Sequence, residues 1–292
     1  VTPADAGVPG GNGQVGSLSL TSDQPMAGVS LEYGHNVVLT QNLQTASAFS
    51  PGDIDTVLYC PLYRNDHAAK KQTSGTQVQN VSDAQQTITL TYTPVGGGAE
   101  ITKAEEVQPG ASATFYAPAV GIPAGSLGSV TVTSTGGIVA VTNEGGTLAD
   151  GQRIMTTYTC FPAASASKRV IIPLYKEFYL GNTSGIQVQN VAGDGSTSTV
   201  QVTYTATNRN AQAVFTHSTP IPDGGSITFW GVSSLSSPAG MTAVSGNPSA
   251  LAGTYGSVVI TSDKPVVAIA NETTYGTNNK KQDSKNYEGF NN

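Results

Sequence analysis

Residues 73–81 read TSGTQVQNV and residues 183–191 read TSGIQVQNV, so nearly the same nine letters recur 110 positions later. The alternation of valine with glutamine has the period of two that is typical of a β-strand with one buried face. Repetition of this kind predicts two copies of one β-rich unit. The flanking matches are Pro61-Leu62-Tyr63 with Pro173-Leu174-Tyr175, and SATFY at 112–116 with SITFW at 226–230.

A second repeated stretch closes each copy. Residues 128–144 read GSVTVTSTGGIVAVTNE, and residues 256–272 read GSVVITSDKPVVAIANE. Alternating apolar residues flank Ser262-Asp263-Lys264-Pro265, which has the composition of a turn. Each closing stretch is therefore predicted to form a β-hairpin.

A third copy of the closing stretch lies near the N-terminus, where residues 16–32 read GSLSLTSDQPMAGVSLE without a preceding QVQNV. A hairpin alone is marginally stable in water and exposes its strand edges, so it needs a partner in the first repeat or in another subunit. If the hairpin is exchanged between subunits, the exchanged segment is Val15–Leu31. The residues expected to enter the partner's groove are Leu18, Leu20, Val29 and Leu31.

Each copy has about the length of an immunoglobulin-like domain, and 34 glycines and 16 prolines argue against long helices. We expect an all-β protein of two tandem immunoglobulin-like β-sandwich domains, at residues 57–162 and 168–292. Residues 1–56 form an N-terminal segment that carries the third hairpin. Most of the extra length of the second copy falls at residues 232–254, which we interpret as a long surface loop.

Charged residues make up only 11% of the chain, and the net charge is −6. No basic stripe is present, which excludes nucleic-acid binding, and no apolar run approaches the length of a membrane span. A weakly charged polar surface suits packing between copies of one protein, although a solvated β-protein would also have one. The first residues, VTPAD, read like an end left by signal-peptide removal, so we expect a secreted or cell-surface protein of a prokaryote.

The only cysteines are Cys60, at the start of the first copy, and Cys160, just after its closing stretch. The alternatives are one disulfide or two small buried thiols. Their positions favour the disulfide, which would enclose 100 residues. Loop-entropy reasoning gives such a bond a stabilisation on the order of 4 kcal/mol.

No constellation for catalysis is found. His35, His67 and His217 lack metal-ligand spacing, and Asp53-Ile54-Asp55 offers too few oxygen ligands for calcium. Nucleophile-elbow, phosphate-loop and zinc-protease motifs are missing. We therefore expect no enzymatic activity, no catalytic residue, no metal and no cofactor.

Other recurring residues have structural or modification readings. Glu32, Glu144 and Glu272 occupy the same place in all three closing stretches, so we interpret them as strand-end residues with local hydrogen bonds. The N-glycosylation acceptor pattern occurs at Asn80, Asn182 and Asn271.

The QVQNV run, the PGASATFY run at 109–116 and the GSxxxTSDxP stretch resemble a repeat of large secreted proteins from filamentous green non-sulfur bacteria. That repeat often reads LPLVMKNYGGWNTGIQVQN and later GSAVITSDQPIAAIVNE. The resemblance covers most of residues 16–290 and departs from the family at 64–72 and 176–182. It implies a surface or extracellular location and a modular repeat architecture, and it implies no enzymatic activity.

These observations lead to two hypotheses. The first is a structural subunit of an extracellular filament, pilus-like fibre or surface layer, which polymerises with itself through strand or hairpin complementation. The second is an adhesin or carbohydrate-binding module that uses exposed aromatic residues around Trp230 and Tyr175–Tyr179. Partial burial of Phe229 and Trp230 on alternate faces of one strand would explain the aromatics without a ligand.

Overall fold

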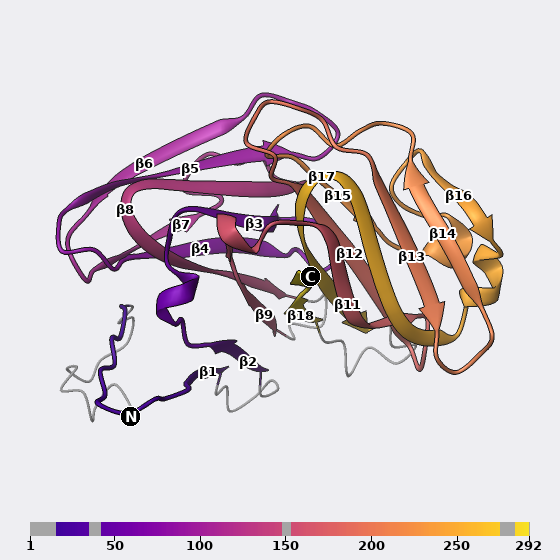
Figure 1. The fold of residues 1–292 in the computed structure, drawn as a ribbon, viewed down its shortest axis with the longest axis horizontal. Coiled ribbons are helices and arrows are strands. Elements are labelled where there is room, and N and C mark those ends of the chain that lie inside the picture. The colour runs from indigo at the N-terminus through magenta and orange to yellow at the C-terminus, as the bar shows by residue number, and fades with distance from the viewer. Residues whose placement is uncertain (1–15, 35–41, 148–152, 275–283, 292) are drawn as a thin grey trace.

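The computed structural model describes residues 16–34, 42–147, 153–274 and 284–291. In these ranges the chain is almost entirely antiparallel β-structure, with a few short 3-10 turns (Figure 1). The all-β, sandwich-type fold is therefore confirmed. The strands fall into a small two-stranded sheet near the N-terminus and two large sheets of eight and nine strands.

The first large sheet folds into two layers because its longest strand, β8, bends and contributes to both. The N-terminal half of β8 pairs with β3 and β5, and the C-terminal half pairs with β4 and β9. Strand β6 extends the first layer beside β5, and β7 extends the second beside β4. The strands are β3 (Asp55–Asn65), β4 (Thr73–Asn80), β5 (Gln86–Pro94), β6 (Ile101–Val107), β7 (Ser112–Tyr116), β8 (Ser126–Thr147), β9 (Arg153–Thr159) and β10 (Phe161–Pro162).

The second large sheet repeats this plan around the long strand β17. Its N-terminal half pairs with β11 and β13, and its C-terminal half pairs with β12 and β18. The strands are β11 (Ser167–Glu177), β12 (Asn182–Asn190), β13 (Val200–Ala206), β14 (Gln212–His217), β15 (Ser226–Phe229), β16 (Met241–Gly246), β17 (Thr254–Thr274), β18 (Ser284–Glu288) and β19 (Phe290–Asn291).

The loop expected at residues 232–254 is only partly a loop. It contains β16, which pairs with β14 at the sheet edge, and two 3-10 turns at Val232–Ser234 and Pro248–Leu251. Serine and glycine suggested a loop, but an open strand edge offers backbone partners to any extended segment that reaches it.

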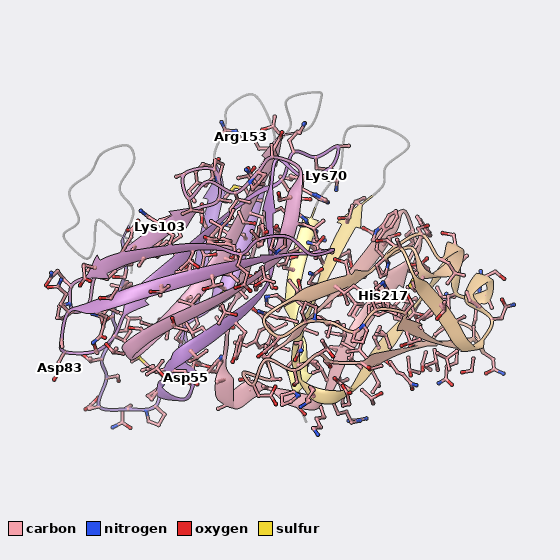
Figure 2. The ribbon with its side chains drawn as sticks, turned by 90° about the horizontal axis from the view of Figure 1, so that it is seen from above. Asp55, Lys70, Asp83, Lys103, Arg153 and His217 are labelled. Carbon is pink, nitrogen blue, oxygen red and sulfur yellow. A yellow bond between two sulfur atoms is a disulfide. The ribbon has the colours of Figure 1, made fainter. Side chains whose placement is uncertain are left out.

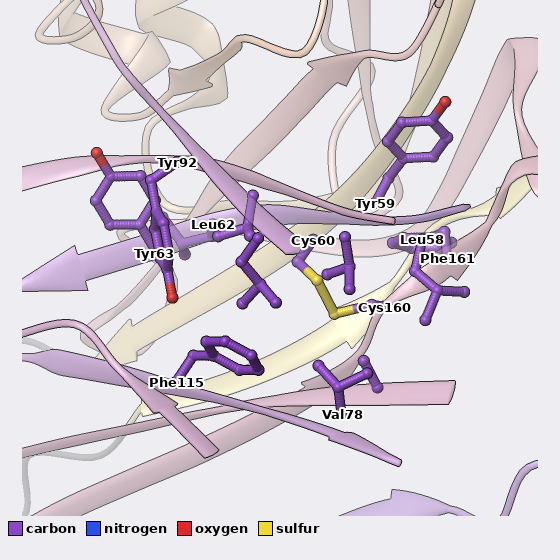
Figure 3. Packing of buried hydrophobic residues seen from close by; sticks show 14 of the residues in the cluster. Leu58, Tyr59, Cys60, Leu62, Tyr63, Val78, Tyr92, Phe115, Cys160 and Phe161 are labelled. Carbon is purple, nitrogen blue, oxygen red and sulfur yellow. A yellow bond between two sulfur atoms is a disulfide. The ribbon is translucent and has the colours of Figure 1, made fainter. Parts of the chain in front are cut away.

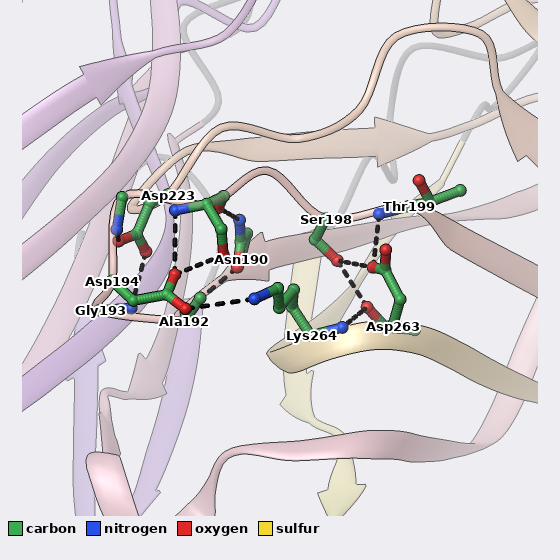
Figure 4. A network of polar contacts seen from close by, with 12 residues as sticks. Asn190, Ala192, Gly193, Asp194, Ser198, Thr199, Asp223, Asp263 and Lys264 are labelled. Atoms are coloured by element: carbon green, nitrogen blue, oxygen red, sulfur yellow. Dashed lines mark hydrogen bonds and ion pairs between the residues drawn. The ribbon is translucent and has the colours of Figure 1, made fainter.

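The predicted hairpins within the closing stretches are wrong. Residues 254–274 form one strand, and Ser262–Pro265 make a bend in it where the chain crosses between layers. The backbone N–H of Thr199 donates to Asp263 Oδ1 at 2.8 Å, and Lys264 Nζ pairs with Asp194 Oδ2 at 3.1 Å (Figure 4). Turn-forming residues accommodate the bend. The chain does not reverse there, because each half of β17 is paired with other strands on both of its edges.

Alternate side chains of each long strand enter a core between the layers. In the first core, Val130 and Val132 from one layer share a buried cluster with Val78 and Phe115 from the other. In the second core, Val258 and Ile260 take the places of Val130 and Val132. These buried apolar residues explain the period of two in the sequence.

The predicted disulfide is confirmed, because Cys60 on β3 bonds Cys160 after β9 (Figure 3). The repeat places Ile172 and Gly289 at the corresponding positions of the second sheet. A Cβ on Gly289 would lie 2.8 Å from Ile172 Cδ1, so isoleucine fills the space that the sulfur atoms occupy in the first core.

Near the N-terminus, β1 (Val29–Gly34) and β2 (Asn42–Ser47) form a hairpin. It corresponds to the C-terminal half of β8 paired with β9 and to the C-terminal half of β17 paired with β18. Glu32 pairs with Gln44, as Glu144 pairs with Thr156 and Glu272 with Lys285. The backbone N–H groups of Ala48, Cys160 and Gly289 donate to the carbonyls of Gly28, Ala140 and Ala268, at 2.9, 2.9 and 2.8 Å. The three copies thus share one register.

Candidate assembly interface

The two large sheets meet face to face, with the β3 and β8 layer of the first on the β12 and β17 layer of the second. Ser129 Oγ donates to the Gly224 carbonyl at 2.6 Å, and Gln189 Nε2 donates to the Gly224 carbonyl at 3.0 Å and the Val130 carbonyl at 3.4 Å. Alternate residues of β12 therefore point away from their own core and toward the neighbouring sheet.

We call this contact between the two large sheets the seam. Apolar side chains fill the rest of it. Tyr59 and Leu62 on β3 share a cluster with Val191, Val267 and Ile269 of the second sheet, and all five are buried. Burial raises the pKa of the Tyr59 phenol, and the nearby carboxylates of Asp223 and Asp55 raise it further. The seam thus resembles a protein interior.

A buried ion pair lies at one end of the seam. Arg64 Nη1 pairs with Glu144 Oε2 at 2.9 Å, and Arg64 Nη2 donates to Asn271 Oδ1 across the seam at 3.2 Å. In the second sheet Lys176 pairs with Glu272 at 2.9 Å. The recurring glutamates are therefore partners of a basic residue on the first strand of each sheet. Glu32 instead accepts from Gln44 Nε2 at 2.6 Å.

The N-terminal segment lies on the first sheet in the way that the first sheet lies on the second. Ser17 Oγ donates to the Gly110 carbonyl at 2.8 Å, as Ser129 does to Gly224. Gln79 Nε2 donates to Ser19 Oγ at 3.4 Å and to the Gly110 carbonyl at 3.3 Å. Residues 16–20 thus occupy the place that a preceding long strand would take.

The four predicted assembly residues are exposed. Leu18 and Leu20 stand where Val130 and Val132 stand in β8, yet 57% and 52% of their surfaces are open to solvent. Val29 and Leu31 on β1 are also exposed. Neither leucine belongs to either core, where β8 and β17 supply the corresponding residues.

The QVQN motif combines three roles that the sequence did not separate. Val78 and Val188 enter the cores, and Asn80 and Asn190 each donate two side-chain hydrogen bonds that close a loop. Gln79 and Gln189 donate outward, to Ser19 of the N-terminal segment and to the Val130 carbonyl of the first sheet. Gln77 and Gln187 donate to serines on the adjacent strand of their own sheet. The sequence signal for these outward contacts is that glutamine recurs in both copies. A strand face exposed to water would accept any polar residue at these positions.

The glycosylation acceptors differ in accessibility. Asn80 and Asn271 are buried, with side-chain amides donating to the Ala84 and Val107 carbonyls and to Asn286, respectively. A glycan there would displace these hydrogen bonds. Asn182, at the start of β12, is partly exposed, and glycosylation remains a prediction at this position.

The residues screened for chemistry do not converge. His67 Nδ1 lies 3.0 Å from the Gly125 carbonyl, and burial lowers its pKa. His217 belongs to the second sheet, distant from Asp55 in the first (Figure 2), and His35 lies outside the described residues. Asp53 and Asp55 accept hydrogen bonds from neighbouring backbone. Among described residues no group of three His, Cys, Asp or Glu side chains could hold a metal.

Aromatic residues gather at one end of the second sheet. The Phe178 and Trp230 rings meet edge to face at 6.3 Å, and the Tyr179 and Tyr255 rings lie 4.8 Å apart. Phe178 is exposed, whereas Tyr175 is buried in the core. Trp230 thus lies beside an accessible aromatic ring.

Comparisons with known proteins identify no family for this chain. No family model matches the sequence, and no curated protein matches it. A solved structure described as the crystal structure of Thermotoga maritima 1070 is 15% identical over 37% of this chain and 94% of its own length, with a TM-score of 0.33.

The described residues contain no apolar helix of membrane-spanning length. The Cys60–Cys160 disulfide is of a kind that persists in oxidising, extracellular compartments.

Proposed function

We propose that the chain is a structural subunit of an extracellular assembly, a filament, pilus-like fibre or surface layer, built through strand or hairpin complementation. The observation that carries the proposal is the third closing stretch, whose core-position residues Leu18 and Leu20 are exposed while the two large sheets each have a core of their own. In this proposal, sheets stack through one repeated contact whose rotation between successive copies does not close a ring. Such a head-to-tail contact gives a fibre rather than a ring.

Concentrated protein is expected to form elongated oligomers, because exposed apolar side chains at strand positions favour association. Negative-stain microscopy of native material and sedimentation velocity of the purified chain over a wide concentration range test this. Particles that stay strictly monomeric at high concentration would contradict the proposal.

A second candidate function is that of an adhesin or carbohydrate-binding module. The aromatic pair of Phe178 and Trp230 favours it, because accessible rings stack on sugar rings. Binding on a glycan array is expected to be lost in Trp230→Ala. The matched control is Tyr116→Ala, at the corresponding exposed position of the first sheet. Equal binding by the wild type and both variants, or binding by none, would contradict this function.

A further inference from the structure

The two ends of the stack carry matching faces. We call the outward side of β4 and the C-terminal half of β8 the docking face, with Gln77, Gln79, Val81, Val139 and Val141. In the second sheet the corresponding positions on β12, β17 and the residue after β12 are covered by the first sheet. Val191 is 5% exposed there, whereas Val81 is 36% exposed; Val139, on the same face, is 4% exposed.

The complementary surface is the outward side of β11, which we call the stacking face, with Ile171, Pro173 and Leu174. The corresponding residues of β3 are the ones that pack into the seam between the sheets. Leu62 is 1% exposed, whereas Leu174 is 38% exposed. A buried apolar position in one copy of the repeat is therefore open at the end of the stack.

We infer that the stacking face of one chain binds the docking face of a second copy, and that residues 16–34 and 42–47 hold the docking face closed until they are displaced. This inference rests on the proposed self-assembly, but it makes face-to-face stacking, and not exchange of the N-terminal hairpin, the contact between subunits. The seam within one chain serves as the model for this contact between chains. The docking and stacking faces carry the same types of side chain as the two surfaces that meet in the seam. The incoming β17 and β18 would lie where residues 16–34 and β2 lie now.

Residues 16–20 cover the docking face with fewer contacts than a second copy would make, which favours their displacement. Residues 16–20 reproduce the polar part of the seam, through Ser17 to Gly110 and through Gln77 and Gln79 to the segment. They lack the apolar part, because no strand corresponding to β3 accompanies them among the residues that the structure describes. An incoming second copy would bring the polar contacts of β17 together with apolar burial from Ile171 and Leu174.

The test measures the concentration at which half of the protein assembles, by sedimentation velocity. Ser17→Asp in the full chain would bring a carboxylate against the Gly110 carbonyl, and removal of residues 1–27 leaves β1 and β2 in place. Either change is expected to lower that concentration about tenfold or more, since hydrogen bonds no longer need breaking before docking. Far-ultraviolet circular dichroism checks that each variant is folded.

Leu174→Glu in either background is expected to restore the monomer, because it places a charge in the seam. The matched control is Leu180→Glu, which alters an exposed leucine away from the stacking face and should assemble normally. The inference is overturned if removing residues 1–27 abolishes assembly, which would make the segment itself the link between subunits, or if Leu174→Glu assembles like its parent. Failure of the full chain and every variant to assemble would contradict the proposed function as well.

Discussion

Replacing both cysteines, as Cys60→Ala with Cys160→Ala, is expected to lower the free energy of unfolding by about 4 kcal/mol. The bond joins β3 to the end of β9 across 100 residues, and a cross-link over so long a loop removes much of the entropy of the unfolded chain. Both residues lie in the first core, so loss of the bond also leaves space among Leu58, Val78 and Phe161. Denaturant unfolding followed by circular dichroism measures the change.

The second sheet is the internal control for this experiment, because Ile172 and Gly289 replace the cysteines there. Hydrogen exchange read by mass spectrometry should show lost protection in β3, β8 and β9, and much less change in β13 and β14. The same loss in both sheets, or no loss in either, would contradict a local role for the disulfide.

Much of the fold could be predicted from the repeated letters. The all-β fold and the Cys60–Cys160 disulfide follow from positions in the sequence, and the structure contains both. The direction of the chain at Ser262–Pro265 could not be predicted, because serine, aspartate and proline suit a reversal and a bend equally. The bend forms because β12 and β18 pair with the C-terminal half of β17. No local sequence pattern predicts these pairings.

The candidate interface was less predictable than the cores. Val78 and Val188 could be assigned to a buried face from alternation alone, but Gln77 and Gln187 occupy the face that normally meets water. What covers that face depends on contacts between segments far apart in the chain. The leucines of residues 16–31 were predicted to be assembly residues, and the structure shows that they are exposed, whereas their position on the first sheet in the same chain was left open by the sequence.

Arg64→Met is expected to destabilise the protein by about 3–5 kcal/mol, because it leaves the carboxylate of Glu144 buried without its charged partner. The Glu144 side chain is 0% exposed, and that of Arg64 is 11% exposed. Ser74 Oγ still donates to Glu144 Oε1 at 3.2 Å, but a neutral hydroxyl does not replace a guanidinium. Equilibrium unfolding in urea measures the difference from the wild type.

Two controls separate the buried charge from general effects of the substitution. Lys71→Met breaks the exposed pair with Asp66 and should change stability by no more than about 0.5 kcal/mol. Arg64→Met combined with Glu144→Gln should recover most of the loss, because the buried site then carries no charge. Arg64 also donates to Asn271, so the single variant should loosen the seam, with faster hydrogen exchange in the C-terminal half of β17. A double variant no more stable than Arg64→Met would show that lost packing of the arginine side chain, and not the unpaired carboxylate, causes the effect.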